Sequence, residues 1–186
     1  MVAAPPRMSK ETLDALCQGP MPVDDGWAWL YRLFDWLAPN GSALRRFSCG
    51  YYSPSVLETA GSGRLYRWLG VPQFGRIIPT GGVAIRRATG ARMAPYTLAG
   101  TSLGAARDFY YRTCVFETLH IPFLLALLAL SVQRASVGRV DYAIQEALMN
   151  LAVNFYPIMH HRNTRRRIVR LLNRGPSRSE SQMERA

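Results

Sequence analysis

Residues 113–133 read TCVFETLHIPFLLALLALSVQ, a run with one acid, Glu117, one histidine, His120, and no basic residue. About 20 such residues form a helix of roughly 30 Å, which is long enough to cross the hydrocarbon core of a bilayer. Pro122 lies near the start of the run, and a membrane helix tolerates the resulting kink better than a soluble one does. The run therefore predicts a transmembrane helix.

Residues 140–159 form a second and weaker apolar run that follows after a short loop. Its polar residues Glu146, Asn150 and Asn154 recur at helical spacing, so they can share one face of a helix. Such a helix would turn the polar face to a partner helix or pocket and its apolar face to lipid. We predict an integral-membrane helical hairpin over residues 113–159, and the alternative is a hairpin buried in the core of a soluble protein.

Arginines flank this predicted hairpin on one side of the membrane. They are Arg86, Arg87, Arg92, Arg107 and Arg112 before it, a cluster from Arg162 to Arg167 after it, and only Arg134 and Arg139 in its loop. Because positive charge favours the cytoplasmic side, both termini are expected in the cytoplasm. We therefore expect the chain in the cytoplasmic (inner) membrane of a bacterium.

The composition narrows the classes of partner. The chain has 186 residues and a formal net charge of +11, almost all of it from arginine. Such a balance suits nucleic acid, an anionic membrane surface or acidic small molecules, although a GC-rich genome also favours arginine over lysine. The arginine run lacks interleaved aromatic residues and any recognisable nucleic-acid module, so no nucleic-acid partner is expected. Three widely spaced cysteines without a CxxC pair exclude a zinc site or a disulfide framework, and no cofactor or metal is predicted.

The rest of the chain is expected to consist of short helices and loops on the cytoplasmic side. Residues 1–23 contain no apolar signal-peptide core and are predicted to be partly mobile. Residues 24–112 form a cytoplasmic or interfacial region, and residues 160–186 a basic tail. In the interfacial region, residues 27–37 carry three tryptophans, which is typical of a helix at headgroup depth, although an aromatic core helix is the alternative. Pro39-Asn40-Gly41 is expected to end this helix. The fold class is therefore mainly α.

Two features of the predicted hairpin can carry chemistry. Glu117 and His120 lie at positions i and i+3 of one helix, so the carboxylate can hold the histidine's tautomer and leave its other ring nitrogen as a general base. The same pair can equally be a structural contact, and a di-iron site would need a second copy of the motif. The arginines after residue 159 can bind lipid headgroups, bind the phosphates of a soluble acyl donor, or serve only as a topology signal.

Three blocks of the sequence resemble one known family. They are Gly63-Arg64-Leu65-Tyr66 with Leu69-Gly70-Val71 and Ile78-Pro79-Thr80-Gly81-Gly82, then Arg112-Thr113 with Glu117 and His120, and then Asn154-Phe155-Tyr156-Pro157-Ile158-Met159 with Arg162, Arg165 and Arg167. In order and spacing they are similar to bacterial glycosyl-4,4'-diaponeurosporenoate acyltransferases of carotenoid biosynthesis. The resemblance spans about residues 57–172.

The resemblance implies a membrane-embedded enzyme that moves a fatty acyl group onto the sugar of a carotenoid or lipid glycoside. It makes Glu117 and His120 the catalytic candidates for activating the sugar hydroxyl. It makes a second set the candidates for holding substrate, donor phosphates or a lipid headgroup: Arg112, Asn154, Tyr156, Arg162, Arg165 and Arg167. An acyl donor such as acyl-CoA would then be a substrate.

The expected partners are membrane lipids, a carotenoid or glycolipid, and other integral-membrane subunits. The chain also departs from the family pattern at Arg67, at His161 and at Asn163-Thr164. These departures keep an alternative open, in which the chain is a non-catalytic accessory subunit of a bacterial membrane complex, including a pigment–protein complex.

Overall fold

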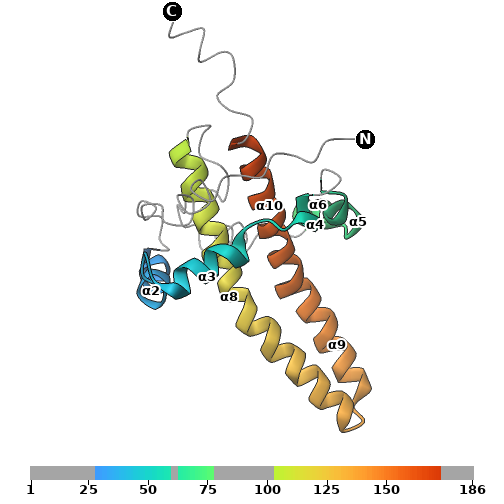
Figure 1. The fold of residues 1–186 in the computed structure, drawn as a ribbon. Helices are drawn as coiled ribbons and strands as arrows, with labels where there is room; N and C mark the ends of the chain where they lie inside the picture. The colour runs from blue at the N-terminus through green and yellow to red at the C-terminus, as the bar shows by residue number, and fades with distance from the viewer. Residues whose placement is uncertain (1–27, 60–62, 78–102, 173–186) are drawn as a thin grey trace, which may run out of the picture.

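The computed structural model describes residues 28–59, 63–77 and 103–172. Within these ranges every regular element is a helix and no strand occurs, so the predicted mainly α fold is confirmed. Figure 1 shows two long helical segments crossed by several short helices. The mobile segment predicted at residues 1–23, the Pro-Thr-Gly-Gly turn at residues 79–82 and the end of the basic tail lie outside the described residues.

The longest helix, α8, spans Leu103–Ser136 and begins well before the apolar run at Thr113. It continues through Pro122 without ending. The chain then reverses at a turn in which Gly138 adopts a positive φ of 79°, and α9 (Val140–Asn150) packs along α8. Figure 1 shows α8 and α9 as the arm that projects from the rest of the molecule.

The two halves of α8 have different surroundings. Buried side chains of the first half include Tyr110, Val115 and Glu117, whereas most side chains after Ile121 are exposed although they are apolar. The segment Gly104–Ser136 is the one described helix that is long and apolar enough to cross a membrane, and α9 does not meet that test. The structure therefore gives one candidate membrane-spanning helix, and the transmembrane hairpin stays a prediction.

A π-helical turn, η2 (Leu151–Phe155), joins α9 to α10 (Tyr156–Leu172). Its wider winding is marked by the Tyr156 N–H, which donates to the carbonyl of Leu151 five residues back. Pro157 follows directly and has no N–H to donate, so regular α-helical bonding is interrupted at this place. Such turns are frequent at functional sites, and this one carries Asn154.

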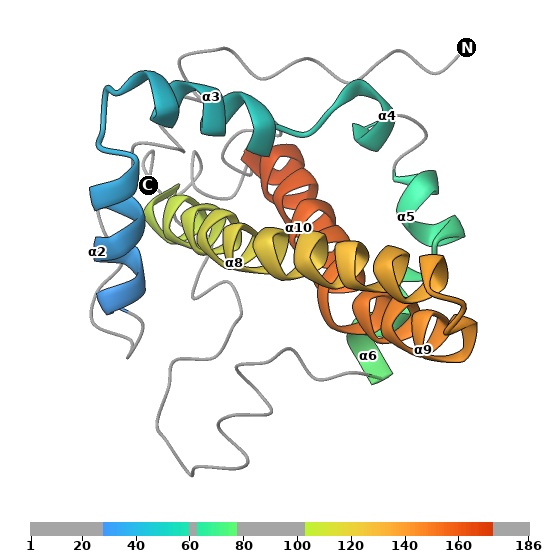
Figure 2. The ribbon, with the colours of Figure 1, turned by 90° about the horizontal axis from the view of Figure 1, so that it is seen from below.

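Five short helices lie around α8 and α10: α2 (Ala28–Leu37), α3 (Ala43–Tyr52), α4 (Val56–Thr59), α5 (Arg64–Trp68) and α6 (Val71–Ile77). Figure 2 shows them as an arc around the long helices. The end of α2 before Pro39 agrees with the sequence prediction. Ser42 caps α3, because its hydroxyl accepts a hydrogen bond of 3.0 Å from the Arg45 N–H.

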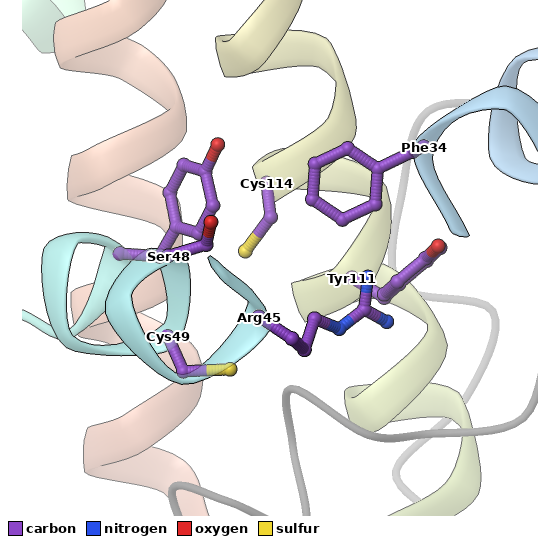
Figure 3. Close-up of a pocket in the computed structure, with 7 residues that line it drawn as sticks. Phe34, Arg45, Ser48, Cys49, Tyr111 and Cys114 are labelled. Atoms are coloured by element: carbon purple, nitrogen blue, oxygen red, sulfur yellow. The ribbon is translucent and has the colours of Figure 1, made fainter. Parts of the chain in front are cut away.

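The core between α2, α3 and the first half of α8 is closely packed. Its side chains include Tyr31, Phe34, Tyr110 and Cys114. Figure 3 shows the residues around a hollow there, with the Arg45 guanidinium beside the rings of Phe34 and Tyr111. The volume of this hollow is about 10 Å³. This volume holds at most one water molecule, so the hollow is no substrate site.

Gly63, the first residue of the block that resembles the acyltransferases, has a steric role. It adopts a positive φ of 82°, a conformation that costs other residues about 1–2 kcal/mol. A Cβ added here would overlap the guanidinium of Arg166, which stacks over the Tyr66 ring and donates to Asn163. Arg166 therefore packs directly onto the glycine backbone.

We expect Gly63→Ala to destabilise the protein more than Gly41→Ala does. Gly41 also has a positive φ, of 80°, but an added Cβ would meet nothing within 4 Å there, so this control measures backbone strain alone. The excess at Gly63, about 1 kcal/mol or more, is the cost of displacing Arg166. Thermal unfolding in detergent measures both variants. Equal losses, or an excess that persists in an Arg166→Ala background, would contradict this assignment.

Candidate functional site

A buried ion cluster holds α10 against α8. Glu117 on α8 is fully buried and accepts hydrogen bonds from two guanidinium groups of α10. Arg162 Nε donates to Glu117 Oε1 at 3.1 Å, and Arg165 Nη2 donates to Oε2. These bonds are the strong, charge-assisted kind, and they join residues far apart in the sequence.

The second carboxylate of the cluster, Glu58, comes from α4. Arg162 Nη1 donates to Glu58 Oε1 at 2.9 Å, and the hydroxyl of Tyr66 donates to the same oxygen. The Ser55 N–H donates to Oε2 at 2.6 Å. Burial by itself raises the pKa of Glu58, but these three donors outweigh it and hold the pKa below its ordinary value. Glu58 is therefore charged at neutral pH.

Backbone and aromatic groups complete the shell around the two arginines. Arg165 Nε donates to the Tyr52 carbonyl at 3.1 Å and Arg165 Nη1 donates to the Thr113 hydroxyl at 3.3 Å. The guanidinium carbon of Arg162 lies 4.7 Å from the ring centre of Tyr51, and that of Arg165 lies 5.2 Å from Tyr52. These contacts fix α3, α8 and α10 relative to one another.

The cluster is balanced in charge, with two carboxylates and two guanidinium groups. Each arginine donates to Glu117, and Arg162 also donates to Glu58. The structure thus places two of the predicted phosphate-binding arginines inside the protein, where protein oxygens already occupy their donors. Arg167, from the same run, has an exposed side chain, and Arg112 on α8 is half-buried.

A second polar chain begins at His120, one helical turn after Glu117. His120 Nδ1 lies 3.2 Å from Asn154 Oδ1, Asn154 Nδ2 donates to Asn150 Oδ1 at 2.9 Å, and Asn150 Nδ2 donates to the Leu124 carbonyl at 2.9 Å. These hydrogen bonds connect α8 to η2, η2 to α9, and α9 back to α8. In the described structure, Glu117 and His120 therefore have different partners: Glu117 bonds two arginines, whereas His120 lies against Asn154.

The order of donors and acceptors in these hydrogen bonds fixes the tautomer of His120. A carbonyl only accepts, so Asn150 must turn its amide nitrogen to Leu124 and its oxygen to Asn154. Asn154 must then donate to Asn150 and present its own oxygen to His120. The proton of neutral His120 consequently lies on Nδ1, and Nε2 carries the lone pair of a base.

The remaining predicted residue, Tyr156, stacks on Phe74 of α6 with 4.6 Å between ring centres. Sequence reasoning placed Asn150 on the polar face but gave it no role in the site. It also missed Glu58 and Tyr52, and no local pattern marks either residue as a partner of α10. Among the described residues, no group of three or more His, Cys, Asp or Glu side chains could hold a metal ion.

The ion cluster and the amide chain both fall within one family match. Residues 49–174 match the model of the glycosyl-4,4'-diaponeurosporenoate acyltransferase family. The chain belongs to this family. No curated protein and no solved structure matches it significantly. Membership in this acyltransferase family indicates an acyltransferase-like function on a carotenoid glycoside, and it confirms the resemblance stated from the sequence blocks.

We expect Glu117→Ala to destabilise the protein by about 3–5 kcal/mol, because it leaves the buried guanidinium of Arg165 without its carboxylate and removes one of the two carboxylates of Arg162. Chemical unfolding of the purified protein in detergent measures the loss. Asp141→Ala is the control, since Asp141 is an exposed acid in the first turn of α9 and its removal costs at most about 1 kcal/mol. Similar losses for both variants would show that the ion cluster does not hold α10 in place.

The buried His161 makes the stability of the protein depend on pH. Its ring is buried on α10, 6.2 Å from Phe116 and 6.0 Å from His120 between ring centres. Burial, together with the charge of Arg165 and the neighbouring His160 and His120, lowers the pKa of His161 well below its ordinary value. Burial, with a smaller contribution from Arg167, also lowers the pKa of His160.

We expect stability to be fully present above about pH 6.5, the unfolded-state pKa of histidine, and to fall as the pH decreases below it. The sign follows because the unfolded chain gains protons there while the folded chain keeps His160 and His161 neutral. His161→Phe preserves a ring against Phe116 and should flatten the profile between about pH 5 and 6.5. Unfolding midpoints across that range test this, and an unchanged slope in the variant would contradict the assignment.

Proposed function

We propose that this chain is a membrane acyltransferase that moves a fatty acyl group from a soluble activated donor, such as acyl-CoA, to a sugar hydroxyl of a carotenoid or lipid glycoside. The observation that carries the proposal is the family match over residues 49–174, which includes His120, its partner Asn154 and the Asn150 that bonds Asn154. The half-buried His120 is the group best prepared to act as a base in the described structure.

His120 Nε2 accepts the proton of the attacking sugar hydroxyl in this mechanism. The hydroxyl oxygen forms an ester bond with the acyl carbon, the carbon–sulfur bond of the donor breaks, and the departing thiolate takes the proton from His120. Asn154 holds the proton on Nδ1 and stabilises the imidazolium that forms, as an orienting partner does in other general-base sites. Asn150 holds the orientation of Asn154 in turn.

Other predicted site residues take positioning or binding roles in this proposal. Glu117, Arg162 and Arg165 form the frame that holds α10 and therefore Asn154 against α8. The exposed Arg167 and the half-buried Arg112 are the arginines we propose to attract the phosphates of the donor. Tyr156 holds η2 through its stacking on Phe74.

We propose a location in the cytoplasmic membrane of a bacterium, with both termini in the cytoplasm. The exposed apolar side chains of α8 and α9 support contact with lipid, and the charged α10 supports a cytoplasmic position for that helix. A soluble acyl donor would then approach from the cytoplasm, while the apolar part of the glycoside stays in the bilayer. No observation favours the alternative, an accessory subunit without catalysis.

The test uses a bacterial host that makes the carotenoid glycoside but not its acyl ester. Expression of the chain should produce the acyl ester, detected by liquid chromatography and mass spectrometry of the pigments. His120→Ala should lower the amount formed per unit of protein by about 100-fold or more. Asn154→Leu should give an intermediate loss, because the base remains but its tautomer is no longer held.

Two controls keep this result interpretable. The variants must accumulate in the membrane and unfold at the same temperature as the original protein, so that a loss of folding is not read as a loss of catalysis. Tyr142→Ala changes an exposed residue of α9 and should leave the yield of ester unchanged. Failure of the original chain to form any acyl ester, despite normal accumulation, would overturn the enzymatic proposal and leave the accessory subunit in its place.

A further inference from the structure

Helix α2 presents a second apolar stripe that the core does not use. Its buried face consists of Leu30, Tyr31 and Phe34, whereas a stripe on its other side is exposed. The exposed residues follow helical spacing: Trp29, Leu33, Trp36 and Leu37. Trp36 is 75% exposed, which is unusual for an indole that is not covered by a partner.

Helix α3 repeats this arrangement. Arg45, Cys49 and Tyr52 are buried, and a second set at positions i, i+3 and i+7 is exposed: Leu44, Phe47 and Tyr51. Phe47 is 74% exposed. Two successive helices thus each carry an uncovered apolar stripe, and these seven residues are called the aromatic stripes below. Large exposed apolar side chains on successive helices are typical of an interaction surface.

Hydrogen bonds to α8 set the level of these helices along the long axis of the molecule. The Tyr111 hydroxyl donates to Asp35 of α2 at 2.6 Å, and the hydroxyl of Tyr52, at the end of α3, bonds that of Thr118. The Thr118 bond lies three residues before Ile121, where α8 changes from buried to exposed side chains, and the Tyr111 bond lies ten residues before it. In Figure 1, α3 crosses α8 and α2 lies to one side of it, both above the tip of the projecting arm, and Figure 2 shows α2 beside the start of α8.

The charges on the same short helices favour an anionic partner. Arg32 of α2, Arg46 of α3, and Arg64 and Arg67 of α5 have exposed side chains. An anionic leaflet attracts each arginine that lies near its surface. Tryptophan is enriched at the headgroup level, where one part of its ring is apolar and another is wet. A stripe with indoles and neighbouring arginines therefore fits a lipid surface.

We propose that α2 and α3 lie in the headgroup region of the cytoplasmic leaflet, with the aromatic stripes turned to the acyl chains, and that only α8 after Ile121 together with α9 enters the hydrocarbon core. The proposal goes beyond acyl transfer, because it holds whether or not the chain catalyses a reaction. The stripe of α2 also lies outside residues 49–174, the part that matches the family.

The inserted arm has a length that agrees with this depth. Residues 121–136 extend roughly 24 Å at 1.5 Å per residue, a little less than the hydrocarbon core of about 30 Å. The turn at the tip of the arm carries Arg134 and Arg139, which can reach the far headgroups by extending their side chains. The first half of α8 then lies in protein on the cytoplasmic side.

This placement puts His120 at headgroup depth. It lies just before Ile121, on the boundary between the buried half of α8 and its exposed half. A glycolipid holds its sugar at the same depth while its apolar part lies in the core, so the hydroxyl groups would meet His120 without leaving the membrane. This step rests on the proposed function, whereas the depth of α2 and α3 does not.

Tryptophan fluorescence in vesicles of phosphatidylethanolamine and phosphatidylglycerol tests the depth. Trp27→Phe and Trp68→Phe leave Trp29 and Trp36 as the only tryptophans, both in the aromatic stripes. Lipids brominated near the headgroup end of the acyl chain should quench their fluorescence strongly. Lipids brominated near the tail end should quench it at least about twofold less, because short-range quenching reports depth.

Two reporters in a variant with all tryptophans replaced by Phe calibrate the result. Leu128→Trp, on the exposed half of α8, should be quenched best by the tail-brominated lipid. Arg167→Trp, on α10, should be quenched by aqueous acrylamide and by neither lipid. These two patterns define what deep insertion and solvent exposure look like in this protein.

Each pattern for the α2 tryptophans has one meaning. Strong quenching by the shallow bromines supports the proposal, even if the chain forms no acyl ester. Quenching like that of the α8 reporter would place α2 inside the hydrocarbon core. Quenching by acrylamide alone would place the aromatic stripes in water, and quenching by no quencher would place them under a protein partner. Every result other than strong quenching by the shallow bromines would overturn the proposal while leaving acyl transfer untouched.

Discussion

The structure depends on one buried carboxylate, Glu117, that two arginines of α10 share. An isolated charge at this depth would be very unfavourable, and an ion pair repays that cost only when its other polar atoms also find partners. Here they do, because Arg162 also reaches Glu58 and Arg165 also reaches the Tyr52 carbonyl. The same bonds that satisfy the charges therefore attach α3, α4 and α10 to α8. A helix with five arginines becomes part of a core because two of them, Arg162 and Arg165, are matched by the carboxylates of Glu58 and Glu117.

This arrangement separates the frame of the site from its reactive group. Glu117 is engaged by arginines, so it does not orient His120, and that task falls to Asn154. Asn154 is in place because η2 widens the helix just before Pro157 and because α10 is fixed to α8 by the ion cluster. The histidine keeps a defined tautomer without a carboxylate beside it.

Local patterns in the sequence predicted parts of several helices but not the partners across them. The apolar run predicted α8, Pro39 predicted the end of α2, and the spacing of Asn150 and Asn154 predicted a shared face. The partner of Glu117 was missed because the i, i+3 rule considers one helix only, and Arg165 lies 48 residues away in the sequence. Glu58 was missed for the same reason. The long-range bonds follow from how the helices pack, which one sequence does not specify locally.

Hydropathy identified the membrane-spanning candidate but not how much of it meets lipid. A side chain such as Val115, buried by protein, and one such as Leu128, exposed on the arm, contribute to an apolar run in the same way. Their surroundings differ because α2 and α3 cover the first and not the second. This distinction changes the energetics of the site. If Glu117 lay in lipid, protein groups would have to shield its ion cluster from hydrocarbon on every side. Enclosed by protein, it needs only the oxygens and guanidinium groups that the chain itself provides, whereas the arm beyond Ile121 exposes mainly apolar side chains such as Phe123 and Leu128.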